Sequence, residues 1–386
     1  MSWVQRAPLS PLTLGIEEEY LLVDIETRNL AQDPPKEILK ECQERHPERV
    51  SPEFLRSQIE VGTSVCTTLQ EARSELSALR STIAEVALPY GLAPIAASTH
   101  PSGKWSEQKH TPKARYATLV GELQGVARRL LICGMHVHVG YDDPDLRIDL
   151  MNQVKYFLPH ILAYSTSSPF WGGHDTGLKS YRLTVFDNLP RTGLPETFDS
   201  YQAYEEYCKT LVESGLVRDR SKLWWDVRLS ARFPTLELRI PDVCTRLEDG
   251  IAVATLYVCL MRHLERLKRN NQRWRIYSNS LIKENRWRAQ RYGLDEGLVD
   301  LGRRETITWP ILTTELIELL QAEATEIGCL KELMHLRTIQ NRGTSAHAQL
   351  RRYYELKDQG ASDEEARRGV VDLLIEQTVL GLGSNV

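Results

Sequence analysis

Five short segments of the chain alternate strictly between apolar and polar residues, which is the pattern of half-buried antiparallel strands. In each of them one face of the predicted strand carries ionisable side chains and the other carries aliphatic or aromatic ones. The segments span residues 14–23, 57–65, 132–141, 224–233 and 234–241. The chain is therefore expected to form a mainly antiparallel sheet with one polar face.

Helical spacing of apolar residues dominates several stretches between these strands. Residues 69–88, 143–163, 247–267, 313–324 and 363–380 are predicted to be helices, and loops rich in Gly, Pro and Ser fall at 167–180 and 188–198. The helices and strands mix without a regular βαβ order, which favours the α+β class. No composition break sets a domain boundary, so residues 1–386 are expected to form one domain.

Composition narrows the class of protein. The chain has 386 residues, 41% apolar and 26% charged, and its 48 basic and 52 acidic residues give a net charge of −4. This balance argues against a dedicated nucleic-acid binder. The longest apolar stretch, 251–261, is too short to cross a bilayer, and the N-terminus does not resemble a signal peptide. Seven cysteines without a C-x-x-C pair indicate reduced thiols, so we expect a cytoplasmic protein without a membrane partner.

The first predicted strand contains GIEEEY, which places three carboxylates in a row. Glu17 and Glu19 project from the same face, about 7 Å apart at strand rise. Two carboxylates at this separation repel unless a cation lies between them or one is protonated. The flanking apolar residues favour a buried cation site over a solvated edge strand. Glu18 faces the apolar layer.

A second pattern, CGMHVHVG, places His136 and His138 on one strand face, with Gly134 and Gly140 on the same face. Glycines at such positions let a bulky group approach the backbone. Two histidines there are as compatible with metal ligands as with satisfied core residues. Zinc hydrolases also use H-x-H, so the motif does not identify the metal.

Carboxylates and arginines alternate in two further strands. TLELRIP offers Glu237 with Arg239, and WWDVR offers Asp226 with Arg228. Each pair is either a plain ion pair or a metal ligand beside an anion-binding arginine.

Residues 262–291 carry ten Lys and Arg but only two Glu. This basic stretch is a solvated helix face, a nucleic-acid patch or a source of phosphate-binding cations, with the helix face favoured. No phosphate loop or dinucleotide-binding turn occurs, so metal ions would have to hold the phosphates of any bound nucleotide. Glu and His side chains are suitable ligands for Mg²⁺ or Mn²⁺.

Eight segments, taken in order, resemble the bacterial carboxylate–amine ligases of the second glutamate–cysteine ligase type, in the glutamine synthetase-like superfamily. The similarity runs from about residue 12 to 378 and comprises LGIEEEYLLVD, EFLRSQIEVGTSVC, CGMHVHVG, SSPFWGGHDTGLKSYR, WWDVR, PTLELRIPD, ENRWRAQRYGLD and GTSAHAQL. The resemblance implies a curved antiparallel catalytic sheet backed by helices. It also implies ATP-dependent joining of a small carboxylate to a small amine through an acyl phosphate, with weak glutamate–cysteine ligase activity.

The resemblance also implies roles for residues that match the family. The implied ligands of Mg²⁺ or Mn²⁺ are Glu17, Glu19, Glu53, Glu60, His136 and Glu237. Glu237 and Arg239 are the implied catalytic residues, with Arg239 contacting phosphate. Arg228 is assigned to the nucleotide ATP and Arg182 to the substrate, while His138 receives no role.

Two other functions compete with this hypothesis. A zinc hydrolase built on His136 and His138 would need further ligands at strand ends, whereas His100, His110 and His174 lie in segments that read as loops. A catalytically silent metal- or nucleotide-binding regulator is disfavoured because the full set of carboxylates is present. Related enzymes are often homodimers or larger, which favours a homo-oligomer.

Overall fold

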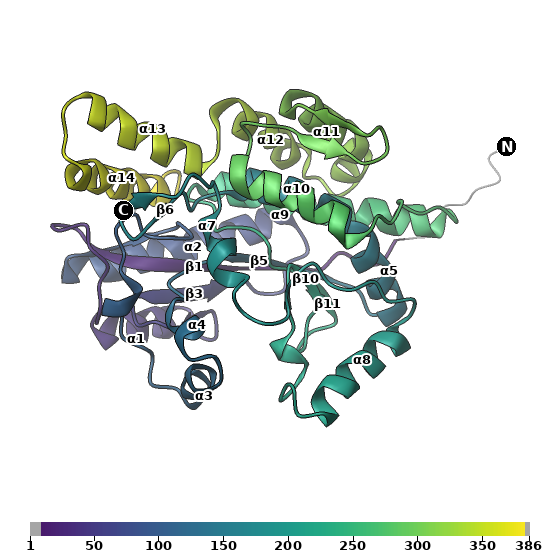
Figure 1. Ribbon diagram of the computed structural model, residues 1–386, viewed down its shortest axis with the longest axis horizontal. Coiled ribbons are helices and arrows are strands. Elements are labelled where there is room, and N and C mark those ends of the chain that lie inside the picture. The colour runs from purple at the N-terminus through teal and green to yellow at the C-terminus, as the bar shows by residue number, and fades with distance from the viewer. Residues whose placement is uncertain (1–8, 383–386) are drawn as a thin grey trace.

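A seven-stranded sheet forms the centre of the molecule in a computed structural model that describes residues 9–382, apart from the side chains of 114–115 and 117–119. Its strand order is β10-β11-β5-β1-β3-β2, with β4 also paired to β1, and all of these pairs are antiparallel. The α+β class with a mainly antiparallel sheet is thus confirmed (Figure 1).

The strands of the sheet are β1 (Leu14–Asp24), β2 (Val50–Pro52), β3 (Gln58–Gly62), β4 (Leu92–Ile95), β5 (Met135–Gly140), β10 (Val227–Leu229) and β11 (Thr235–Leu238). Three small two-stranded sheets use β6 (Phe170–Trp171), β7 (His174–Asp175), β8 (Thr192–Gly193), β9 (Trp224–Trp225), β12 (Leu298–Asp300) and β13 (Glu305–Ile307).

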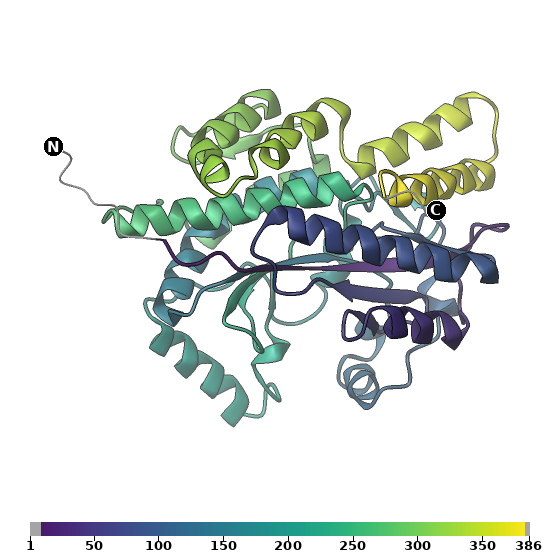
Figure 2. The same ribbon diagram turned by 180° about the vertical axis from the view of Figure 1, so that it is seen from behind.

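Helices make up most of the chain outside the strands. They are α1 (Lys36–Arg45), α2 (Leu69–Ala87), α3 (Ala114–Leu123), α4 (Gly125–Arg128), α5 (Pro144–Val154), α6 (Leu158–Ser165), α7 (Tyr181–Phe186), α8 (Tyr201–Glu213), α9 (Leu247–Arg269), α10 (Asn279–Tyr292), α11 (Trp309–Glu326), α12 (Leu330–Arg342), α13 (Ser345–Asp358) and α14 (Asp363–Val379). Figure 2 shows α2 and α9 lying along the sheet on its rear side.

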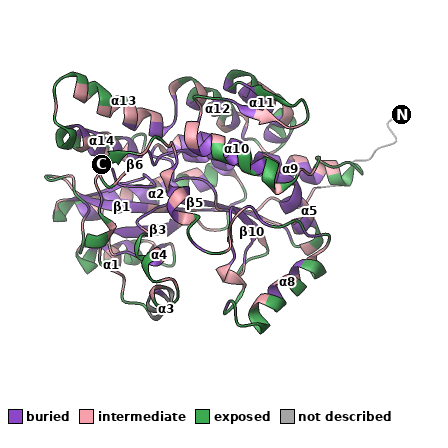
Figure 3. Cartoon of the chain, viewed as in Figure 1, coloured by how far each residue is buried: buried purple, intermediate pink, exposed green. Residues whose placement is uncertain are grey.

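The rear face of the sheet is apolar, as the alternation predicts. Ile16, Tyr20 and Leu22 of β1 are fully buried, and so are Met135, Val137 and Val139 of β5. Helix α2 begins at a capping box in which Thr68 and Glu71 satisfy each other's backbone N–H groups. Figure 3 shows that burial is concentrated in the sheet and in the helix faces against it, so the core lies behind the polar face.

The segment 224–233 is not one strand. β9 pairs in parallel with β8, whereas β10 pairs with β11, and the chain breaks between them at Asp226. The carbonyl oxygen of Asp226 accepts the N–H groups of both Arg239 and Ile240, which replaces regular pairing at this point. The predicted helix 143–163 is likewise divided, into α5, a 3₁₀ turn at Lys155–Phe157 and α6.

All seven cysteines are buried and free, which confirms that the chain has no disulfide framework. Within residues 9–382, no helix has the length and apolar character needed to span a membrane. The signal-peptide expectation rests on residues 1–15, of which residues 1–8 lie outside the described part of the chain.

Candidate active site

Strand pairing gathers the polar side chains onto one face of the sheet. In register, Glu19 lies opposite Glu60, and Glu17 opposite His136. Between β5 and β11, His138 lies opposite Glu237. Between β11 and β10, Glu237 lies opposite Arg228. Side chains of directly opposed residues are close neighbours on the same face of a sheet. Five strands, from β10 to β3, therefore contribute to one continuous polar site.

Three carboxylates form the first part of this site. Glu19, Glu53 and Glu60 each offer an oxygen, and these oxygens all lie within 4.8 Å of one another. Burial, and then the charge of Glu53, raise the pKa of Glu19 to about 8, although the Gly134 N–H donates to Glu19 Oε2 at 2.7 Å. Burial and the like charge of Glu53 together outweigh the nearby cations Arg182 and Arg239, which act in the opposite direction. The donor set fits a hard divalent cation with oxygen ligands.

Glu17 and two histidines form the second part. His136 Nδ1 lies 3.1 Å from Glu17 Oε2, and His138 Nε2 lies 3.7 Å from Glu17 Oε1. Burial and the nearby Arg239 lower the pKa of His136 to about 4, so its ring is neutral. A carboxylate only accepts hydrogen bonds, so His136 Nδ1 carries the proton and its Nε2 lone pair is available for a metal. Burial alone would raise the pKa of Glu17, but the adjacent His136 and His138 hold it below its ordinary value.

Glu237 is held by two arginines. Arg228 donates to both of its carboxylate oxygens, at 2.9 and 3.0 Å, and Arg239 Nη1 donates to Oε1. Burial opposes ionisation of Glu237, yet Arg239 and Arg228 keep its pKa well below the ordinary range. The residue therefore stays charged, and it orients both guanidinium groups on the polar face.

Arg182 lies beside the site, against Gly134. Its Nη1 and Nη2 donate to the carbonyl oxygens of Ile240 and Arg239, at 3.2 and 3.1 Å. A Cβ atom at Gly134 would collide with the Arg182 guanidinium, so the space left by this glycine is filled by Arg182. Gly140 makes room in the same way for Thr13. Arg182 thus fixes the backbone that carries Arg239.

The sequence did not reveal the ion pair on the rear of β1. Glu18 and Arg80 are both fully buried, and Arg80 Nε and Nη2 donate to the carboxylate at 2.9 and 2.8 Å. Arg80 also donates to the carbonyl oxygens of Cys244 and Thr245, beyond the end of β11. The position of Glu18 on the apolar face was the one available signal, but nothing in the sequence indicated its partner on α2.

Asp226 and the basic stretch turn out to be mainly structural. Asp226 accepts from Arg286 on α10, which also binds Asp187, so it points away from Arg228. The other cations of the stretch with carboxylate partners are Arg262, Arg266, Lys268, Arg269, Arg273 and Arg288. Seven of the ten cations in this stretch are therefore engaged in ion pairs with carboxylates.

Comparison with known proteins identifies the family. The model of glutamate–cysteine ligase family 2 matches residues 13–375. A protein of Rhodospirillum rubrum, named "Putative glutamate--cysteine ligase 2", is 58% identical over 97% of both chains. One of the same name from Jannaschia sp. is 52% identical over 94% of this chain and 96% of its own length.

Two solved structures share the fold. The glutamate–cysteine ligase of Francisella tularensis, in complex with AMP, superposes with a TM-score of 0.68 at 14% identity, covering 97% of this chain and 90% of that one. The bifunctional glutathione synthetase of Pasteurella multocida gives a TM-score of 0.67 at 18% identity, covering 95% of this chain and 52% of that one. These likenesses show that the chain shares the fold of these two ligases, with an antiparallel sheet and helices as expected. The chain therefore belongs to glutamate–cysteine ligase family 2, a family of ATP-dependent enzymes that form C–N bonds.

Proposed function

We propose that this protein joins a small carboxylic acid to an amine with ATP, through an acyl phosphate, and that glutamate is the acid. Weak formation of γ-glutamylcysteine is part of the proposal. The observation that carries it is the single polar face on which six candidate metal ligands lie beside Arg228 and Arg239. We further propose that the chain works as one ligase domain, because residues from Glu17 to Arg239 build one face.

The six residues divide into two sets. Glu19, Glu53 and Glu60, whose oxygens lie within 4.8 Å of one another, would hold one cation, with Mg²⁺ or Mn²⁺ as the proposed metals. Glu17, His136 and Glu237 share the same polar face and are the proposed ligands of a second cation, although their ligand atoms do not form such a cluster in this structure. A divalent cation supplies charge neutralisation between the phosphates of ATP and the substrate carboxylate, which are both anionic. The raised pKa of Glu19, caused first by burial and then by the charge of Glu53, fits this assignment.

The arginines have separate proposed roles. Arg239 stabilises the negative charge of the transferring phosphoryl group, and Arg228 binds the nucleotide. Glu237 holds both guanidinium groups in place through its two oxygens. Both terminal nitrogens of Arg182 bond to backbone carbonyls, so we propose that it acts chiefly by fixing Arg239, and its contact with substrate stays a prediction.

The zinc hydrolase alternative gains no support. Among residues 9–382, apart from the undescribed side chains of α3, the one cluster with ligand atoms within 4.8 Å consists of carboxylates alone. Carboxylate oxygens suit Mg²⁺ or Mn²⁺ better than zinc.

Trapping with hydroxylamine tests the proposal. The enzyme is incubated with ATP, Mg²⁺, hydroxylamine and a panel of carboxylates that includes glutamate. We expect hydroxamate and ADP in equal amounts with at least one acid, and no reaction with EDTA. Glu19→Gln should lower the rate at least ~100-fold, the scale of losing a charge stabiliser. Glu26→Gln, at an exposed residue just beyond β1, is the control and should leave the rate unchanged. AMP as the product, or hydroxamate without nucleotide, would overturn the mechanism.

A further inference from the structure

One buried carboxylate close to Arg239 has no part in the proposed chemistry. Asp242 follows Arg239 by three residues, in the segment after β11, and is fully buried. Burial raises its pKa, and the nearby Arg182 acts in the opposite direction. A carboxylate taken out of water is costly unless hydrogen bonds satisfy it, so its partners show what it does.

Three hydrogen bonds join Asp242 to the loop that precedes α7. The Ser167 N–H and the Ser168 hydroxyl donate to Oδ2 at 2.9 and 2.7 Å, and the Ser180 hydroxyl donates to Oδ1 at 2.9 Å. All three serines are fully buried, like Asp242 itself. These serines stand at the two ends of the loop 167–180, so one carboxylate holds both ends together.

The same serines seat the helix that carries Arg182. Ser180 is the N-cap residue of α7, yet its hydroxyl donates to Asp242 and caps no N–H group of α7. Ser168 takes over the cap, because its Oγ accepts the N–H of Arg182 at 3.0 Å. The Ser168 hydroxyl therefore links the Asp242 carboxylate directly to the backbone of Arg182.

These contacts close a ring that includes Arg239. The Arg182 guanidinium binds the carbonyl oxygens of Arg239 and Ile240. Asp242 belongs to the same segment and forms an isolated β-bridge with Gly134, beside which the guanidinium lies. Asp242 thus anchors both the helix that supplies Arg182 and the segment that Arg182 holds.

We propose that Asp242 is a positioning residue for phosphoryl transfer, because it fixes Arg182 and thereby Arg239. The inference rests on the proposed function, in which Arg239 stabilises the transferring phosphoryl group. Loss of an interaction made mainly in the transition state lowers kcat and leaves KM nearly unchanged. Loosening Asp242 should therefore lower the kcat of ADP release and spare the KM for ATP, whereas a structural role alone would lower only the stability.

Ser168→Ala tests the link between Asp242 and Arg182. It removes the hydroxyl that bonds to both, and the variant is assayed for ADP release with Mg²⁺ and the best acid from a panel of carboxylates. We expect kcat to fall at least ~10-fold and the KM for ATP to change less than ~2-fold.

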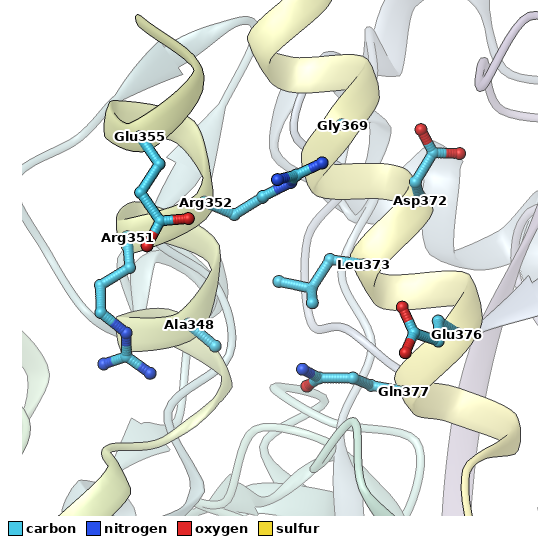
Figure 4. Close-up of a pocket in the computed structure, with 9 residues that line it drawn as sticks. All are labelled: Ala348, Arg351, Arg352, Glu355, Gly369, Asp372, Leu373, Glu376 and Gln377. Atoms are coloured by element: carbon cyan, nitrogen blue, oxygen red, sulfur yellow. The ribbon is translucent and has the colours of Figure 1, made fainter. Parts of the chain in front are cut away.

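Thr313→Val is the matched control in the core. The hydroxyl of this buried residue on α11 bonds to the Tyr164 hydroxyl and to the Trp309 carbonyl oxygen, so its loss also breaks two hydrogen bonds. Urea unfolding should show a similar loss of stability in Ser168→Ala and Thr313→Val, but Thr313→Val should keep its kcat. Glu355→Gln, at an exposed carboxylate of the groove between α13 and α14 (Figure 4), should change neither quantity.

Substitutions of Asp242 itself test whether its hydrogen bonds carry the effect. In Asp242→Asn the amide oxygen can accept from Ser167 and Ser168, and the NH₂ group can donate to the Ser180 oxygen, so three contacts persist. Asp242→Ala breaks all of them, and we expect its kcat to be at least ~10-fold below that of Asp242→Asn. Should Asp242→Ala fail to fold, Asp242→Asn is compared with Ser168→Ala, whose kcat it should also exceed.

The outcomes distinguish this inference from the proposed function. A protein that releases no ADP with any carboxylate contradicts both. If the protein releases ADP but Ser168→Ala keeps its kcat, the inference alone is wrong. It is also wrong if Thr313→Val loses as much kcat as Ser168→Ala, or if Asp242→Asn turns over no faster than the variants that break the hydrogen bonds.

Discussion

Three consecutive glutamates of β1 have different environments because alternate residues of a strand project to opposite sides. Glu17 and Glu19 face the polar site, where Glu17 meets two histidines and Glu19 meets two carboxylates. Glu18 faces the core and is neutralised by Arg80. Identical side chains thus belong to the proposed metal site on one face and to a buried ion pair on the other.

This difference predicts contrasting effects of the same substitution. Glu18→Gln leaves Arg80 buried without a countercharge, so the free energy of unfolding should fall by about 3–5 kcal/mol in urea denaturation. Glu17→Gln should change it by less than about 1 kcal/mol, because the neighbouring His136 is neutral. The rate of ADP release, in contrast, should fall at least ~100-fold in Glu17→Gln. Equal destabilisation by both substitutions would contradict these assignments.

At the scale of elements, β5 and the chain after β11 depend on each other through Gly134. The Arg182 guanidinium occupies the space beside this glycine and binds the carbonyl oxygens of Arg239 and Ile240. The orientation of Arg239 is therefore set jointly by β5, by α7 and by the segment that follows β11.

Gly134→Ala should disturb this arrangement. The new methyl group displaces Arg182, so we expect a loss of about 1–3 kcal/mol in stability and a fall of ~10- to 100-fold in turnover through misplacement of Arg239. Gly15→Ala is the matched control, since a Cβ there meets its nearest atoms at 3.9 Å. Steady-state ADP release and urea unfolding of both variants give the comparison, and an unaffected Gly134→Ala enzyme would show that Arg182 does not hold Arg239.

Alternation of polar and apolar residues was enough to predict β1, β5 and β11, and the face on which Glu17, His136 and Glu237 meet. The register that places Glu19 opposite Glu60 depends on contacts remote in sequence and could not be derived from local pattern. The bounds of helix α10 were not predicted, because the basic stretch 262–291 was assigned to a helix face as a whole, and the role of Arg286 as the partner of Asp226 was not foreseen. Whether the six candidate ligands bind metal stays a prediction.

At the scale of the whole molecule, buried neutral histidines link stability to pH. Burial lowers the pKa of His100 to about 4, and both ring nitrogens are used by the neutral form: Nε2 donates to the Arg28 carbonyl and Nδ1 accepts from the Ser102 N–H. The unfolded chain takes up a proton near pH 6.5, whereas the folded chain resists it until about pH 4.

Stability should therefore fall as the pH is lowered from about 6.5 to 4, by on the order of 3 kcal/mol for this residue. His100→Gln should be less stable at neutral pH but should show a flatter pH dependence in urea unfolding. His174→Gln, at an exposed position on β7, is the control and should keep the original slope. If the free energy of unfolding of His100→Gln depended on pH as steeply as that of the original protein, His100 would not be the cause of the loss of stability at low pH.

The route of one oxygen atom tests the central claim most directly. The acid that supports ADP release is labelled with ¹⁸O at both oxygens of its carboxylate group. It is then incubated with enzyme, ATP, Mg²⁺ and hydroxylamine. If the carboxylate attacks the γ-phosphorus, one labelled oxygen must leave with inorganic phosphate when the amine displaces it. We predict one ¹⁸O atom per phosphate released, measured by mass spectrometry. Unlabelled phosphate, or label appearing in AMP, would contradict the acyl phosphate mechanism.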